Sequence, residues 1–123
     1  MLAVFLTGCG ASGTRVDGAR DAARAFEQAL ASGDYGAACG LLAPETRAQV
    51  EEDEKQACAK ALEGQELPAP GAVNGAEVYG RQALVRAGGE TLFLSQFTRG
   101  WRVVAAGCTP QVDKPYQCIL KGG

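Results

Sequence analysis

The first half of the chain carries its apolar residues at the three- and four-residue spacing of an amphipathic helix. Between residues 17 and 32 the apolar stripe consists of Ala19, Ala22, Ala23, Phe26 and Leu30, and the polar positions off it are Arg20, Arg24, Glu27 and Gln28. Asp17 is suited to cap the first N–H groups of this helix, and Gly33 to end it in the left-handed conformation. The pattern therefore predicts a helix over residues 17–32.

Two further helical segments follow in the same half. Asp34 is placed to cap a shorter helix over residues 35–42, and Pro44 suits the first turn of a third helix. The third stretch runs to Gly64 and is expected to break near four consecutive acidic residues, 51–54. These acids suggest a cation site or a solvated face, and we favour the solvated face because consecutive residues point around a helix and do not converge.

The second half of the chain predicts strands. A connector of residues 65–74, which contains two prolines, separates it from the helices. The runs that favour strands are 76–86, 91–97 and 101–106, with a short fourth strand expected at 116–120. Gly80 is expected to form a bulge within the first run, and Gly88 and Gly89 a hairpin turn.

Helices followed by consecutive hairpins predict an α+β fold, in which N-terminal helices pack on a curved antiparallel sheet of three to four strands. The chain of 123 residues is long enough for one domain, which we place at residues 17–123. Its content is 46% hydrophobic and 21% charged, as in globular proteins. No apolar run approaches the ~18 residues of a membrane-spanning helix.

Charge and composition narrow the possible functions. The net charge is −2 and the basic residues form no run, so the electrostatic footprint of a nucleic-acid binder is missing. Histidine is absent, which removes the usual general base near neutral pH and the commonest metal ligand. We therefore expect a non-enzymatic protein with no catalytic residues, no cofactor and no metal, and no nucleic-acid partner.

The stretch FLTGCGASG, residues 5–13, fits two motifs. Its glycines spell GxGxxG, but a dinucleotide site also needs a buried strand before the glycines and a βαβ unit after them, and neither neighbour is present. Residues 6–9, Leu-Thr-Gly-Cys, instead resemble the bacterial lipobox at every position. The resemblance implies cleavage before Cys9 and a diacylglycerol thioether on its sulfur.

The lipobox divides the N-terminus into a signal-peptide remnant, residues 1–8, and a lipidated flexible tether, residues 9–16. One feature departs from the pattern, because only eight residues precede Cys9 and none is basic, whereas a secretory signal begins with a basic region. We expect the translation start to lie further upstream. The location implied is the extracytoplasmic face of the cell membrane, with the lipid anchor as one partner and an unknown envelope protein or small ligand as another.

Once Cys9 is set aside, four cysteines remain: Cys39, Cys58, Cys108 and Cys118. In an exported protein such an even set indicates disulfides, and sequence alone leaves three connectivities open. The positions of the cysteines in the helical and the strand-rich halves favour Cys39–Cys58 and Cys108–Cys118. A zinc site would need closely spaced pairs such as CxxC, and a catalytic thiol would need a base.

A family resemblance rests on three features: the run GDYGAACGLLAPETRAQ, a cysteine one helix later, and a Trp-Arg-Val-Val strand near the end. Together they are similar to small secreted lipoproteins of high-GC Gram-positive bacteria. These look like members of the nuclear-transport-factor-like (NTF2-like) superfamily, whose curved sheet wraps helices into a cone. The resemblance covers about residues 17–120 and describes packing more than chemistry.

The superfamily implies two alternatives for function. Some members are isomerases or dehydratases with a pocket in the cone, and others only bind or dimerise. By analogy the possible pocket-lining residues are Tyr35, Glu77, Tyr79 and Trp101. We favour simpler roles for them, with the aromatic residues at the edge of the core and Glu77 facing solvent. An enzyme would in addition need a buried acid with a raised pKa that faces a cavity.

Overall fold

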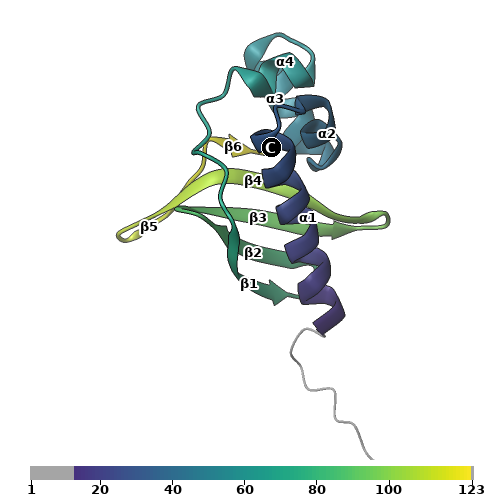
Figure 1. The fold of residues 1–123 in the computed structure, drawn as a ribbon. Coiled ribbons are helices and arrows are strands. Elements are labelled where there is room, and N and C mark those ends of the chain that lie inside the picture. Colours follow the sequence, from purple (N-terminus) through teal and green to yellow (C-terminus); the bar gives the residue numbers. More distant parts are fainter. Residues whose placement is uncertain (1–12, 123) are drawn as a thin grey trace, which may run out of the picture.

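The computed structural model describes residues 13–122, in which four helices precede six strands (Figure 1). The helices are α1 (Gly13–Ala31), α2 (Tyr35–Gly40), α3 (Pro44–Glu54) and α4 (Cys58–Glu63). The strands are β1 (Val73–Tyr79), β2 (Gln82–Ala87), β3 (Glu90–Phe97), β4 (Gly100–Gln111), β5 (Lys114–Gln117) and β6 (Leu120–Lys121). The predicted α+β class is confirmed.

Helix α1 begins one turn earlier than the sequence pattern indicates. We expected the helix to start at Asp17 and residues 9–16 to form a tether, but residues 13–16 are helical. Val16 is half-buried and lies three residues before the buried Ala19, so the apolar stripe extends into this turn. None of the helices in residues 13–122 has the length and hydropathy needed to span a membrane.

The short helices begin and end where local signals place them. The Asp34 side chain accepts a hydrogen bond from the Ala37 N–H at 3.0 Å and so caps α2. Pro44 opens α3, and the predicted break follows Glu54, where Lys55 adopts the left-handed conformation with φ 54°. A single disulfide, Cys39–Cys58, then joins α2 to α4.

The strands form one open antiparallel sheet in the order β1-β2-β3-β4-β5, with β6 also paired to β4. The prediction of one strand over residues 76–86 with a bulge at Gly80 was wrong. Gly80 has φ 58° and lies in a turn, after which Tyr79 pairs with Gln82, so the run is a hairpin of two strands. The turn predicted at Gly88 and Gly89 does join β2 to β3.

The C-terminal part of the sheet is also more extensive than expected. Strand β4 continues to Gln111 and pairs with β3, β5 and β6, and the Cys108–Cys118 disulfide ties it to the segment before β6. The described residues therefore contain six strands where we expected three to four. Both disulfides are the pairs that the sequence favoured.

Helix α1 crosses one face of the sheet, and the core lies between them (Figure 1). Phe26 is fully buried there, together with Val85, Leu92 and Leu94 of the strands. Near the N-terminal end of α1, Gly18 lies so close to Trp101 that an added Cβ would be 3.0 Å from the indole ring. The connector, residues 64–72, passes from α4 back to the edge strand β1 beside α1 (Figure 1).

Candidate functional site

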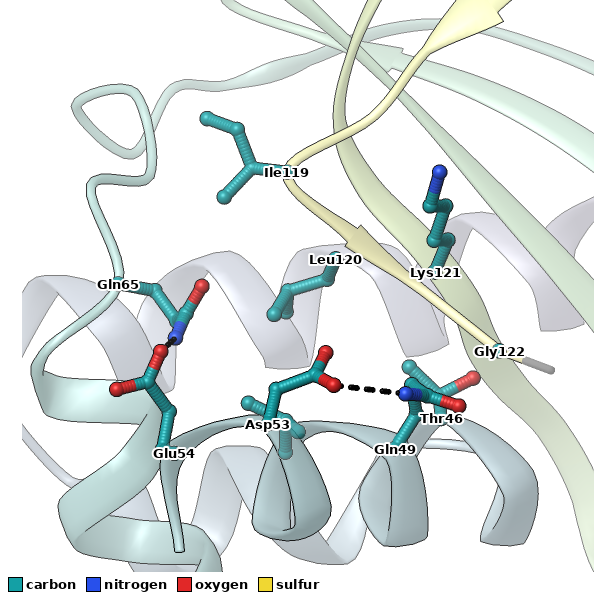
Figure 2. A pocket seen from close by; sticks show the side chains of 10 residues that line it. Thr46, Gln49, Asp53, Glu54, Gln65, Ile119, Leu120, Lys121 and Gly122 are labelled. Atoms are coloured by element: carbon teal, nitrogen blue, oxygen red, sulfur yellow. Dashed lines mark hydrogen bonds between the residues drawn. The ribbon is translucent and has the colours of Figure 1, made fainter.

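A hollow of about 410 Å³ lies between α3 and β6 (Figure 2). We call it the first hollow. Its apolar floor contains Val50 and Leu120, which are buried, and the half-exposed Ile119. Its polar lining residues are Thr46, Gln49, Asp53, Glu54, Gln65 and Lys121. A concave apolar floor with a few polar groups around it is the usual form of a small-ligand site.

Two amide side chains orient the carboxylates of the first hollow. The Gln49 Nε2 group donates to Asp53 Oδ1 at 2.8 Å, and the Gln65 Nε2 group donates to Glu54 Oε1 at 2.8 Å (Figure 2). Asp53 and Glu54 are at the C-terminal end of α3, whereas Lys121 comes from β6. The hollow thus presents two acids and one cation to a molecule that would rest on its apolar floor.

Thr46 anchors α3 to the sheet at the end of this hollow. It is 1% exposed, and its Oγ1 donates to the Val104 carbonyl of β4 at 2.7 Å. Replacing Thr46 by valine keeps the shape of the side chain but leaves the carbonyl without this donor. Urea unfolding should show a loss of about 1–3 kcal/mol, the usual penalty for an unsatisfied buried polar group.

The control for Thr46→Val is Thr98→Val, which changes the same atoms at an exposed position between β3 and β4. Its free energy of unfolding should stay within about 0.5 kcal/mol of the native value. If Thr46→Val were equally neutral, the hydrogen bond to Val104 would not anchor α3.

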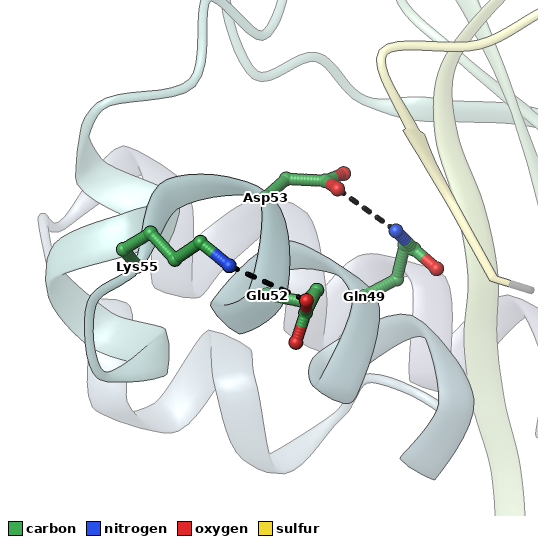
Figure 3. Close-up of polar contacts among 4 residues, drawn as sticks. All are labelled: Gln49, Glu52, Asp53 and Lys55. Carbon is green, nitrogen blue, oxygen red and sulfur yellow. Dashed lines mark hydrogen bonds and ion pairs between the residues drawn. The ribbon is translucent and has the colours of Figure 1, made fainter.

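The four acids of residues 51–54 do not gather around a cation. Figure 3 shows Glu52 directed to Lys55, at 3.3 Å, and Asp53 directed to Gln49. Glu51 accepts the backbone N–H of Cys58 at 3.0 Å and thereby caps α4, while Glu54 turns toward the connector. Consecutive positions point around the helix, so each acid has a different neighbour, as expected for a solvated face.

Two carboxyl groups are buried away from these acids, between α1 and the sheet. Glu27 of α1 is 4% exposed and Glu90 at the start of β3 is 5% exposed. Both oxygens of Glu27 and Oε2 of Glu90 expose less than 1 Å² each, and none of the three accepts a hydrogen bond of regular geometry. Ionised carboxylates only accept hydrogen bonds, so they offer each other none unless one carries a proton.

The surroundings of this buried carboxyl pair favour the protonated form. Burial, together with the hydrogen bond and the charge that Glu90 presents, raises the pKa of Glu27 to about 9, against a smaller lowering by the Gly71 backbone. Burial also raises the pKa of Glu90, which Glu27 and the Gly107 backbone act to lower. At neutral pH the pair therefore holds at least one proton.

A second hollow of about 440 Å³ adjoins the pair between α1 and the connector. Its lining residues are Arg24, Glu27, Gln28, Ala31, Pro70, Gly71, Ala72 and Val73. Because the oxygens of Glu27 are sealed, the lining contributed by this residue is its hydrocarbon stem. The carboxyl groups are thus closed off from this hollow.

The four pocket residues suggested by the family resemblance occupy three separate places in the described structure. Glu77 and Tyr79 are neighbours on the edge strand β1, where the Tyr79 hydroxyl donates to Glu77 Oε2 at 2.9 Å and the pKa of Tyr79 is raised by this bond. Trp101 is buried against α1, and Tyr35 is half-buried at the start of α2. Cys9, the predicted lipidation site, lies outside the described residues.

Sequence reasoning placed Glu27 on the polar side of α1, and the structure shows that it is buried. A signal was present, because Ala19, Ala23 and Glu27 follow one another at four-residue spacing and so share one helix face. Glu90 follows a glycine turn at the start of a strand, and we find no local signal for its burial. The pair is therefore visible only when α1 and β3 are placed together.

Residues 13–122 contain no cluster of three or more acidic or cysteine side chains that could hold a metal ion. No protein-family model, curated protein or solved structure matches this chain. Its function is therefore argued from its own residues.

Proposed function

We propose that this chain is a lipid-anchored domain on the extracytoplasmic face of the cell membrane, which binds a protein partner or a small ligand without catalysing a reaction. The two disulfides, Cys39–Cys58 and Cys108–Cys118, carry this proposal. Such bonds persist in oxidising compartments and are rare in the cytosol. They leave Cys9 as the odd cysteine of the five, at the position that a lipobox requires.

The resemblance to small NTF2-like lipoproteins of high-GC Gram-positive bacteria also supports the proposal. The first hollow of the protein offers a small molecule an apolar floor with Asp53, Glu54 and Lys121 around it. The absence of histidine from the chain favours binding over acid–base catalysis.

The mass of the native protein from the membrane fraction tests the anchor. We expect cleavage before Cys9, the added mass of a diacylglycerol group, and two disulfides. A Cys9→Ala variant should lose the lipid and leave the membrane fraction, while its disulfides remain. An unmodified Cys9 on the native protein would overturn the anchor. Five free thiols on denatured, unreduced protein, Cys9 included, would indicate a cytosolic interaction domain instead.

A fragment screen by NMR tests ligand binding at the first hollow. A molecule that binds there should shift the side-chain amide signals of Gln49 and Gln65, which line it. The Gln28 amide lines the second hollow and is the internal control, because its signal should stay in place. Fragments that bind to the protein without shifting Gln49 or Gln65 would remove this hollow from the proposal.

The buried carboxyl pair favours one alternative, a small cone-pocket enzyme of isomerase or dehydratase type. Such an enzyme needs a buried acid with a raised pKa, and Glu27 meets this condition beside the second hollow. The acid must also touch the substrate, which the sealed oxygens prevent in this conformation. A fragment bound in the second hollow should shift the carboxyl carbon signal of Glu27 if this alternative holds, and an unmoved signal would contradict it.

A further inference from the structure

Four segments that are distant in the sequence meet at the buried carboxyl pair. Glu27 belongs to α1 and Glu90 to β3, while the backbone of Gly71 in the connector contacts Glu27 and that of Gly107 in β4 contacts Glu90. The pair is thus placed where the helix, the connector and two strands are held together.

The connector reaches this place through an unusually close backbone contact. A Cβ on Gly71 would lie 2.6 Å from the Gly88 Cα and would clash with it. The two backbones can approach this closely because both residues are glycines. The Gly88 N–H also donates to the Ala72 carbonyl at 3.0 Å. Because no side chains separate the two segments, the connector lies directly against the β2–β3 turn, next to Glu90.

The charged side chains of the surrounding elements do not neutralise the pair. On α1, Arg24 forms an ion pair with Asp21 at 3.1 Å, and Arg20 lies a turn further from Glu27. Those on the neighbouring strands have partners elsewhere, since Arg86 of β2 pairs with Glu77 of β1 at 3.4 Å and Arg102 of β4 donates to the Gly40 carbonyl. Two ionised carboxylates without a cation would repel each other in this buried position.

We propose that Glu27 and Glu90 share a proton and act as a clasp, which fastens the connector and the β2–β3 turn to α1 and closes the inner wall of the second hollow. With one carboxyl protonated, its O–H donates to the other, and two of the three unsatisfied oxygens become partners. When the proton is lost, two negative charges face each other behind the connector, and their repulsion should loosen the contact of the connector with α1.

The sign of the resulting pH dependence follows from proton binding. Glu27 has a pKa of about 9 in the folded protein and an ordinary value of 4.5 when it is unfolded and exposed. The folded state binds the proton more tightly, so the contribution to stability is complete below pH 4.5 and is lost as the pH rises toward 9. The protein should therefore be most stable in acid with respect to this pair.

The experiment is a carbon-13 NMR titration of the glutamate carboxyl carbons in the native protein, combined with thermal unfolding between pH 5 and 9.5. The Glu27 signal should stay at its protonated position through neutral pH, and Glu90→Gln should lower its midpoint by removing the charged neighbour. The melting temperature of the native protein should fall as the pH rises. In Glu27→Gln the amide donates permanently to Glu90, so the decline should flatten.

Glu66→Gln is the matched control, because Glu66 is an exposed acid of the same connector and its loss should leave both profiles unchanged. A Glu27 signal that titrates at the ordinary glutamate value would overturn the clasp. So would a large rise in melting temperature on adding calcium at neutral pH, provided that Glu27→Gln abolishes it, since the pair would then hold a cation in place of a proton.

Discussion

Replacing Phe26 by alanine should lower the free energy of unfolding by about 3–5 kcal/mol, the range for removing a large aromatic side chain from a packed core. Phe26 is fully buried where α1 crosses the sheet and belongs to the same core cluster as Leu92 and Leu94. The substitution removes the buried ring and leaves a cavity, which the surrounding helix and strands fill only in part when they relax. Urea unfolding followed by circular dichroism measures the loss.

Phe97→Ala is the control, since this phenylalanine is 39% exposed at the end of β3. Removing its ring should change stability by well under half of the Phe26 effect, because less apolar surface returns to water. Equal losses in the two variants would mean that Phe26 is not central to the core. Because Phe26→Ala has a large expected effect, the unfolding curves of both proteins should be recorded at low temperature, where the folded baseline of the variant can be measured.

Removing the Cys39–Cys58 disulfide by a double alanine substitution should destabilise the protein by about 3 kcal/mol in the chain-entropy model. The bond joins positions 19 residues apart and links the two short helices α2 and α4. Helices of this length have little stability of their own, so their packing depends on tertiary links. Equilibrium unfolding in urea measures the change. Because both cysteines of this bond are replaced, neither leaves an unpaired thiol behind.

The matched comparison is the double alanine variant of Cys108 and Cys118, whose sequence separation is 10. Its loss should be smaller by a few tenths of a kcal/mol, since the entropy of closing a loop changes only slowly with its length. An unchanged free energy of unfolding after removal of Cys39–Cys58 would show that α2 and α4 are held by packing alone.

The helices were largely predictable because their signals are local. The apolar stripe of α1, the Asp34 cap and the Pro44 start all act within one or two turns, and the structure contains each of them. The start of α1 was misplaced because Gly13 has low helix propensity and Asp17 resembles an N-cap, whereas the helix continues through the half-buried Val16 to Gly13.

The strand count was harder to predict because a turn and a bulge share the same signal. A single glycine inside an apolar run fits either one, and only the pairing of Tyr79 with Gln82 shows that the chain reverses at Gly80. The length of β4 likewise depends on its partners β5 and β6, which come later in the chain.

The sequence by itself determined the α+β class, the Asp34 cap of α2 and the division of the cysteines between the two halves, because periodicity and capping act over a few neighbouring residues. Only the tertiary structure decided that the four suggested pocket residues occupy three separate places and that Glu27 meets Glu90. Desolvation and charge repulsion depend on what surrounds a carboxyl group in space. The pKa values of Glu27 and Glu90 are raised chiefly by burial, which both residues owe to the packing of α1 on the sheet.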